Sequence, residues 1–385
     1  MKKLSLSTPY LKFSELKNVY NCIKTEWIST SGTYINLFEK KLSKYTKSNY
    51  TVLCNSGTSA LDIALKLTGI KKNDEVIVPT LTFIATINCI IYNNASPIFM
   101  DSDETFNIDV KKVLEFIENR TFTRNGNTYN SKSKKLIRAI IIVHVWGNVA
   151  EFKKLIRICK NKNIKIIEDA TESLGSKYYL DKKRIKHTGT IGDIGCTSFN
   201  GNKIITTGAG GAIFLKNKKL YKHAQYLISQ AKDNFDKFIH NNVGYNYRMP
   251  NINAAIGLSQ LNNLSVILDK KKFIHNFYLK NFKNNKNFEI LDLKNNSINN
   301  NWLNILIIKN SNIDIKKIHN FLISKNIECR YVWFLNHLQK PFLKFEKYKI
   351  NSSLNLLDTS LCLPSSTHLN SSELKYICKT INEYV

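Results

Sequence analysis

Several features that mark membrane, secreted or disulfide-bonded proteins are missing from this sequence. No apolar run approaches the roughly 18 residues that a membrane-spanning helix needs, so no membrane association is expected. The N-terminal residues, MKKLSLSTPYLKF, carry two lysines without the apolar region that follows them in a secretory signal. The eight cysteines form no CxxC pair and no zinc spacing, which is typical of buried thiols in a reducing compartment. We therefore expect a cytoplasmic protein.

The motifs of several common enzyme classes are also missing. No G-x-G-x-x-G follows the first predicted strand and no Walker P-loop occurs, which argues against binding of dinucleotides and nucleoside triphosphates. There is no H-E-x-x-H and no cluster of carboxylates, so no metal is expected. No G-x-S-x-G elbow marks a nucleophilic serine.

Acidic residues are scarce, and the 57 Lys and Arg against 29 Asp and Glu give a net charge of +28. Such a charge favours an anionic partner, which could be nucleic acid, a membrane surface or a small substrate. A nucleic-acid-binding arm would concentrate its lysines in blocks, whereas only short clusters occur here, at 132–135, 216–219 and 270–272. We interpret the charge mainly as a Lys/Asn/Ile-rich surface and expect no nucleic-acid partner; that alternative rests on charge alone.

Strands and helices alternate through about the first 200 residues, which predicts an α/β fold. The predicted strands are 50–53, 75–79, 96–100, 139–145 and 164–167. Ala139–Val145 is continuously apolar, as in a parallel strand buried on both faces. We therefore expect a doubly wound, mostly parallel sheet with its ligand at the carboxyl ends of the strands.

The remaining chain predicts additional helices and a second, smaller domain. Helical spacing covers 14–27, 37–45, 60–67, 109–118, 221–235 and 251–279, and a polar, turn-rich insertion lies at 120–134. From about residue 281 the pattern changes to strands at 288–293, 302–309 and 327–331 with a helix at 315–325 and another at the end. We predict a large domain at 1–265, N-terminal segment included, and a small α+β C-terminal domain at 266–385.

One lysine, Lys203, stands in the middle of TSFNGNKIITTGAGGAIF, residues 197–214. Ser198 precedes it, and a glycine-rich turn with a short predicted strand follows it. A lysine held this way can be withdrawn from water, which lowers its pKa and makes its amine nucleophilic. The glycines allow positive φ and the close approach of a ligand. The alternative is a surface lysine beside a turn, as most lysines are.

Other candidate residues fall where predicted strands end. Asn55–Thr58 opens a helix, whose free N–H groups could form an anion site; the alternative is an ordinary capped helix. Phe83 could lie over a flat ring or in the core. Asp169, in IIEDATESLG, could pair with the protonated ring nitrogen of a cofactor such as pyridoxal 5'-phosphate (PLP), or cap a helix. Glu172 could complete a capping box or reach the hydroxyl of that ring.

Together these segments resemble PLP-dependent enzymes of the aspartate aminotransferase fold (fold type I), and within them the DegT/StrS-type sugar-nucleotide aminotransferases. The matching segments, spread over residues 9–369, are WISTSGTYINLFE, NSGTSALDIAL, VPTLTFIATINCI, VHVWGN, IIEDATESLGS, GTIGDIGCTSFNGNKIITTGAGG, GYNYRMPNINAAIGLSQL and LCLPSST. Ala209 stands where many relatives have the glutamate of GEGG. Dehydratase relatives have histidine at the position of Lys203, so the lysine favours transamination.

The resemblance implies how the large domain would bind PLP. Lys203 would be the catalytic residue, which bonds the cofactor through its amine and then moves a proton. Asp169 would pair with the ring nitrogen, Phe83 would stack on the ring and Glu172 would lie near its hydroxyl. The residues implied for the phosphate are Ser56, Gly57, Thr58 and Ser198.

The resemblance also implies residues for the partner subunit and the substrate. Asn246 would reach the phosphate of the neighbouring subunit, so we expect a homodimer with shared active sites. Arg248 would contact an anionic group of donor or substrate, or form a salt bridge near a helix start. The segment RYVWFLNHLQKPF would face the sugar with Arg330, Trp333 and His337, of which the last two could equally be packed side chains.

The activity implied is amino transfer from L-glutamate to the C4 keto group of a nucleotide-linked 4-keto-6-deoxy sugar, for surface polysaccharide or glycan synthesis. The insertion at 120–134 and the segment SFNGNKIITTG resemble the branch that uses a UDP-N-acetylated 4-keto hexose, on a bacillosamine or legionaminic-type route. GDP-perosamine synthase is the runner-up, followed by a dTDP-sugar 3- or 4-aminotransferase. A PLP-fold regulator without turnover and a nucleic-acid-binding protein are the alternatives from other classes.

Overall fold

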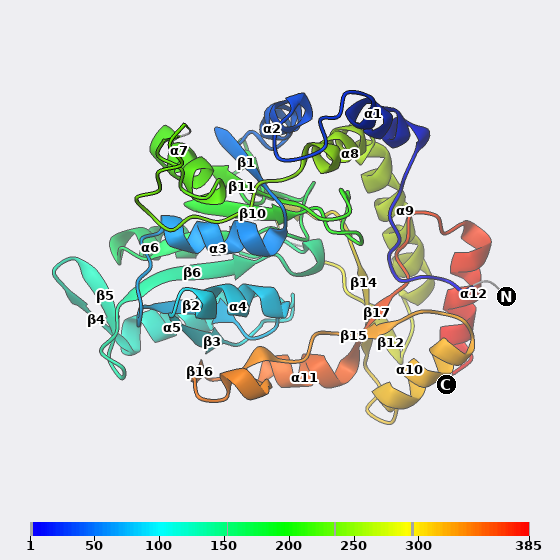
Figure 1. The fold of residues 1–385 in the computed structure, drawn as a ribbon. Helices are drawn as coiled ribbons and strands as arrows, with labels where there is room; N and C mark the ends of the chain where they lie inside the picture. Colours follow the sequence, from blue (N-terminus) through cyan, green and yellow to red (C-terminus); the bar gives the residue numbers. More distant parts are fainter. Residues whose placement is uncertain (1–2, 152, 235, 294–295, 385) are drawn as a thin grey trace.

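A mixed sheet of eight strands forms the centre of the computed structural model, which describes residues 3–151, 153–234, 236–293 and 296–384 (Figure 1). In spatial order the strands are β1 (Tyr50–Cys54), β11 (Gly211–Leu215), β10 (Ile194–Ser198), β7 (Lys165–Asp169), β6 (Ile137–Val143), β2 (Glu75–Pro79), β3 (Ser96–Met100) and β16 (Glu346–Tyr348). Strand β11 runs antiparallel to both neighbours, and all other pairs are parallel. The predicted α/β fold with a mostly parallel sheet is confirmed.

Helices cover both faces of this sheet, and β6 shows the reason. Its residues Ala139, Ile141 and Val143 belong to one apolar cluster, whereas Ile140 and Ile142 belong to the other. Alternate side chains of a strand point to opposite faces, so an unbroken apolar run buries both. The first cluster contains residues of α3 (Gly57–Leu67), α4 (Ile84–Tyr92) and α7 (Lys218–Ile228), and the second contains residues of α5 (Val110–Asn119) and α6 (Lys153–Asn161).

The two ends of the chain add a helical layer and a second sheet. Helices α1 (Phe13–Lys24) and α2 (Thr33–Thr46) pack on α8 (Asn251–Asn262), above the large sheet in Figure 1. The second sheet has the order β12 (Phe288–Ile290), β14 (Asn304–Ile308), β17 (Ser360–Leu363) and β15 (Arg330–Tyr331). It packs with α9 (Leu264–Phe282), α10 (Ile315–Ser324) and α12 (Ser371–Asn382) around a third apolar cluster.

Smaller elements complete the chain. The insertion predicted at 120–134 is a hairpin of β4 (Thr121–Arg124) and β5 (Asn127–Asn130). A three-stranded sheet joins β13 (Ser297–Ile298) to β8 (Lys177–Tyr179) and β9 (Ile185–His187), and α11 (Ser352–Thr359) precedes β17. Because β16 pairs with β3, part of the chain after residue 265 lies in the large sheet, and the domain division at that residue stays a prediction.

Some predicted boundaries differ from the observed ones. The helix predicted over 221–235 ends at Ile228, because Gln230 and Ala231 take positive φ values of 67° and 51° and turn the chain; residue 235 lies outside the described residues. The stretch predicted as helical over 251–279 consists of two helices that meet at Asn263. Strand β6 ends at Val143, and a short 3-10 turn, Val145–Gly147, follows it.

The cysteines are buried, as predicted. All eight are buried with free thiols, and burial raises the pKa of Cys159 to about 12. Within the described ranges, no group of three or more His, Cys, Asp or Glu side chains could hold a metal ion. No helix in that part of the chain is both long enough and apolar enough to cross a membrane.

Asp101 fastens the C-terminal part of the chain to the large sheet. It follows β3, and its buried carboxylate accepts hydrogen bonds from the backbone N–H groups of Asn351, Ser352 and Ser353, at the start of α11. Lys112 Nζ lies 2.5 Å from its Oδ2. Burial alone would raise the pKa of Asp101, but the lysine and these donors together lower it. Asp101 is thus ionised, with a helix N-terminus and a cation as partners.

We expect Asp101→Asn to lower the free energy of unfolding by about 3 kcal/mol, because it leaves the half-buried Lys112 and the start of α11 without their buried anion. Asp101 has a lower pKa in the folded chain than in the unfolded one. Its stabilisation is therefore present at neutral pH and lost as the pH falls below the ordinary range of an aspartate. Urea unfolding at neutral and acid pH measures both effects. The exposed Asp181→Asn is the control, and equal behaviour of the two variants would contradict the role of Asp101.

Candidate active site

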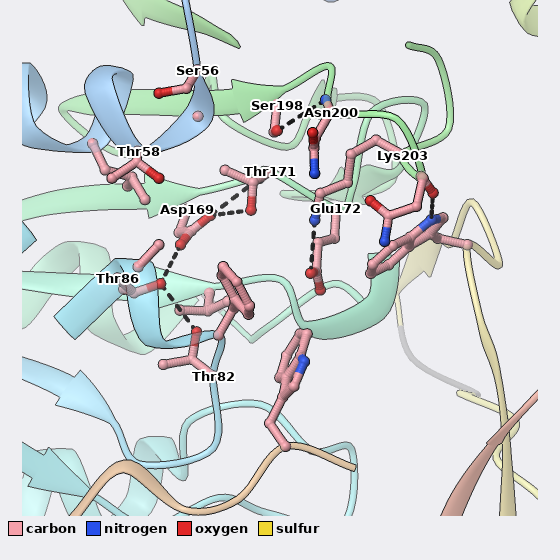
Figure 2. Close-up of a pocket in the computed structure, with 18 of the residues that line it drawn as sticks. Ser56, Thr58, Thr82, Thr86, Asp169, Thr171, Glu172, Ser198, Asn200 and Lys203 are labelled. Atoms are coloured by element: carbon pink, nitrogen blue, oxygen red, sulfur yellow. Dashed lines mark hydrogen bonds and ion pairs between the residues drawn. The ribbon is translucent and has the colours of Figure 1, made fainter. Parts of the chain in front are cut away.

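A cavity of about 350 Å³ opens at the carboxyl ends of the central parallel strands (Figure 2). Val143, Asp169 and Ser198 contribute from the ends of β6, β7 and β10, and the loop between β10 and β11 contributes Lys203. The volume is within the usual range for sites that bind cofactors and small substrates. Eight of the predicted cofactor residues line it: Ser56, Gly57, Thr58, Phe83, Asp169, Glu172, Ser198 and Lys203.

The start of α3 forms one end of the cavity. Ser56 is the helix cap, and its hydroxyl accepts a hydrogen bond from the N–H of Ser59 at 3.0 Å. The first backbone hydrogen bond of the helix runs from Ala60 N to Ser56 O, so the N–H groups of Gly57 and Thr58 precede it. With the positive end of the helix dipole they form an anion site. Ser198 closes this site, since a Cβ at Gly57 would lie 2.8 Å from its Cβ.

Asp169 lies at the end of β7 with its carboxylate in the cavity (Figure 2). Oδ2 accepts a hydrogen bond from the Thr86 hydroxyl at 2.7 Å, and Oδ1 accepts from the Thr171 hydroxyl at 2.7 Å and its N–H at 3.2 Å. These donors hold the buried carboxylate in one orientation. Residues 170–176 form turns rather than a helix, so the alternative readings of Asp169 and Glu172 as helix caps are wrong.

Lys203 and Glu172 form an ion pair inside the cavity. Lys203 Nζ lies 3.0 Å from Glu172 Oε1, and the lysine side chain is 13% exposed, so the surface-lysine alternative is wrong. The other oxygen of Glu172 accepts the N–H of Trp146 at 2.8 Å. Burial raises the pKa of Glu172, and the charge of Lys203 partly offsets this. Gly208, at φ 80°, turns the lysine loop back toward β11, as the glycine-rich sequence predicted.

Aromatic side chains form the opposite wall. Phe83 lines the cavity with 54% of its surface exposed, so the core alternative for this residue is wrong. Its ring centroid lies 6.3 Å from that of Trp333, which lies 5.2 Å from that of Trp146. Arg330 also lines the cavity and forms an ion pair with Glu328 at 3.0 Å. The wall therefore combines aromatic rings with a cation.

Three predicted residues do not line this cavity. The backbone oxygen of Asn246, an exposed residue, accepts a hydrogen bond from Asn55 at 3.2 Å. Arg248 lies in the loop before α8. Burial raises the pKa of nearby Glu39 to about 7, and the charge of Arg248 only partly opposes this shift. His337 is buried with Nδ1 2.7 Å from the Thr80 hydroxyl, a packed loop position. Their roles with cofactor and substrate stay predictions.

Sequence reasoning missed other residues of the cavity. Thr86 and Thr171 orient Asp169, and Asn202 and Trp302 line the cavity beside Lys203. Thr171 follows Asp169 by two residues, a spacing at which side chain and backbone often bond, and this was the available signal. Trp302 comes from the distant β13–β14 connection, and no local pattern connects it to the lysine.

These parts fit PLP: an amine, a fixed carboxylate, an anion site at a helix start and an aromatic wall surround one cavity. The fold and this set of side chains define a PLP-dependent enzyme of the aspartate aminotransferase fold. The chain belongs to the DegT/DnrJ/EryC1/StrS aminotransferase family, whose model matches residues 9–382.

Individual relatives agree with this assignment. The chain is 35% identical to GDP-perosamine synthase of Escherichia coli O157:H7, over all of this chain and 99% of the relative. It is 29% identical to UDP-4-amino-4,6-dideoxy-N-acetyl-beta-L-altrosamine transaminase of Campylobacter jejuni strain 81-176, over 96% of this chain and 94% of the relative. The solved structure of Helicobacter pylori PseC, an aminotransferase involved in the biosynthesis of pseudoaminic acid, has the same fold, with a TM-score of 0.87 at 23% identity over 99% of both chains.

We expect Gly57→Ala to weaken PLP binding roughly tenfold or more, because the added methyl group would push Ser198 away from the anion site. Titration of the cofactor-free protein with PLP, followed by absorbance, measures the dissociation constant. Gly201→Ala is the matched control, since its Cβ would meet no atom within 4 Å and its φ is not positive. Equal affinities of the two variants would place the phosphate elsewhere.

Proposed function

We propose that this enzyme transfers the amino group of L-glutamate to the C4 keto group of a nucleotide-linked 4-keto-6-deoxy sugar. The observation that carries the proposal is the convergence of Lys203 and Asp169 on a cavity that also contains Arg330 and Trp333. The first two suit amino transfer, and the second two suit a diphosphate and a sugar face. Membership of the family and the names of the relatives support a sugar aminotransferase.

When bound, PLP supplies an electron-accepting ring that stabilises negative charge beside the amino group being transferred. Asp169, oriented by Thr86 and Thr171, would hold a proton at the ring nitrogen. Phe83 would stack on the ring. Lys203 would attach the cofactor through Nζ and, once released, would take and return the proton of the carbon that bears nitrogen. Glu172 would keep the released amine within reach, since it already lies 3.0 Å from Nζ.

The phosphate group of PLP would occupy the start of α3. The groups available there are the N–H groups of Gly57 and Thr58 and the hydroxyls of Ser56, Thr58 and Ser198. An anion at a helix start gains from both the unpaired donors and the dipole. Of these groups, the Ser56 hydroxyl already accepts the N–H of Ser59, so we assign it the smaller contribution.

The sugar substrate that we place first is GDP-linked. The full-length match to GDP-perosamine synthase is at 35% identity, against 29% for the UDP-altrosamine transaminase. The two candidate substrates thus change places relative to the expectation from the sequence motifs, and the UDP-N-acetylated sugar becomes the second candidate. Arg330, at the wall of the cavity, would contact the diphosphate of either substrate.

The active unit that we propose is a homodimer. Asn246 is exposed and does not line the cavity of its own chain, as expected if it completes the site of a second copy. Helix α1 and the segment after it also expose an apolar face, with Leu16, Tyr20, Ile23 and Trp27 each more than half exposed. Leu16, Tyr20 and Ile23 recur at helical spacing along α1, and an exposed apolar patch of this kind is typical of an interface between copies.

The cofactor chemistry is tested by absorbance. The wild-type protein with PLP should show a visible band that shifts into the near ultraviolet when L-glutamate is added. Lys203→Ala should lose this response, because the amine that holds the cofactor is gone. Lys132→Ala, at an exposed position, is the control. GDP- and UDP-linked 4-keto sugars, supplied with glutamate, should then yield amino sugar and 2-oxoglutarate by mass spectrometry. No visible band with PLP would end the aminotransferase proposal.

The shared site is tested by mixing two inactive variants. Lys203→Ala and Asn246→Ala should each have little activity at a PLP concentration that saturates only the wild type. After the two are unfolded and refolded together, about a quarter of wild-type activity should return, because half of the randomly paired dimers are hybrids with one intact site. No recovery, with dimers confirmed by ultracentrifugation, would show that Asn246 acts in its own subunit, and full activity of Asn246→Ala alone would show that it has no role in the site.

A further inference from the structure

The indole ring of Trp302 faces the amine of Lys203. Lys203 Nζ lies 4.3 Å from the ring centroid, and 3.0 Å from Glu172 Oε1. A cation over the face of a tryptophan is attracted by the electrons of the ring, and the attraction grows when water is excluded. Trp302 is 3% exposed, so little water reaches this contact. The ammonium form of Lys203 therefore has two stabilising neighbours, one ionic and one aromatic.

Hydrogen bonds fix Trp302 at its ring and at its backbone. Indole Nε1 donates to the carbonyl of Asn202 at 2.7 Å, and this residue directly precedes Lys203 in the chain. The N–H of Trp302 donates to the side chain of Asn300 at 3.0 Å. Asn300 in turn donates to the carbonyl of Glu172 at 2.8 Å. The ring is thus tied to the residue before Lys203, and the backbone of Trp302 is tied through Asn300 to the backbone of Glu172.

The carbonyl of Trp302 is held by a second lysine. Lys271, on α9, donates to this carbonyl at 2.9 Å and to the carbonyl of Ser365 at 2.6 Å. It is buried, and burial lowers its pKa to about 7. A buried amine with carbonyl partners is less favourable for stability than an apolar side chain of the same size would be. The buried position of Lys271 is explained if its two hydrogen bonds hold Trp302 and Ser365 against α9.

We propose that Trp302 is a positioning residue for Lys203: its indole face holds the free amine beside Glu172 and stabilises the ammonium that forms once the amine has taken a proton, and Lys271 holds the indole in place. The inference rests on the proposed function, because there the amine alternates between a bond to the cofactor and a free state. In the free state the amine would stay within reach of the reacting carbon instead of turning toward the solvent. Trp302 acts through Lys203 and needs no contact with the substrate.

The test uses the full-length protein without cofactor. Short pulses of acetic anhydride across neutral and alkaline pH acetylate neutral amines only, and peptide mass spectrometry gives the acetylated fraction of Lys203, with exposed Lys132 as internal reference. Trp302→Leu should lower the pH midpoint of Lys203 acetylation by about one unit, since the ammonium loses its aromatic partner while the site stays apolar. Trp302→Phe, which keeps a weaker ring, should lower it less.

Trp333→Leu is the matched control, because Trp333 lines the same cavity and should leave the midpoint unchanged. Lys271→Met should move the midpoint in the same direction as Trp302→Leu, whereas Lys272→Met, at the exposed neighbour, should not. An unchanged or raised midpoint in Trp302→Leu would overturn the proposal. If Lys271→Met does not fold, the Trp302 variants alone decide the role of the indole.

The titration does not depend on turnover, so it separates this inference from the proposed function. If Trp302→Leu shifts the midpoint but the enzyme aminates no sugar, the role of Trp302 is supported and the proposed sugar substrate is wrong. If the wild-type enzyme aminates sugars but Trp302→Leu has the same midpoint as the wild type, the proposed function is supported and the positioning role of Trp302 is wrong.

Discussion

Two buried carboxylates at and just after the end of β7 constrain the whole site. Asp169 and Glu172 lie in a region from which water is largely excluded, and a carboxylate there is stable only if donors surround it. Those donors come from separate parts of the chain: Thr86 from α4, the N–H of Trp146 from the turn after β6, and Lys203 from the loop after β10. Satisfying the two anions therefore brings together the elements that form the cavity.

This arrangement imposes strain at one residue. Trp146 has a φ of 54°, a conformation that is uncommon for residues other than glycine. The conformation directs its N–H to Glu172 and its ring to Trp333. Strain of this kind persists where the surroundings stabilise it, and it is concentrated at functional sites. One backbone conformation thus contributes both to the aromatic wall and to holding the carboxylate that pairs with Lys203.

The C-terminal third of the chain reaches the same site through two anchors. Asp101 binds the start of α11 and holds the segment that follows β15, and Lys271 holds the connection that carries Trp302. Arg330 lies in β15 and Trp333 at the start of the segment that follows it, and both line the cavity. Contacts far from the cavity therefore help to position its lining side chains, and a substitution at either anchor would displace side chains of the cavity wall.

The sequence by itself determined the alternation of strands and helices, the glycine-rich turn after Lys203 and the polar residues at strand ends. These depend on local preference and on apolar periodicity, which are properties of short segments. Only the tertiary structure decided that Asp169 and Glu172 accept donors instead of capping a helix, that His337 packs against Thr80, and that Trp302 meets Lys203. Such contacts join residues that are distant in the chain, and they form when the buried charges and rings find partners.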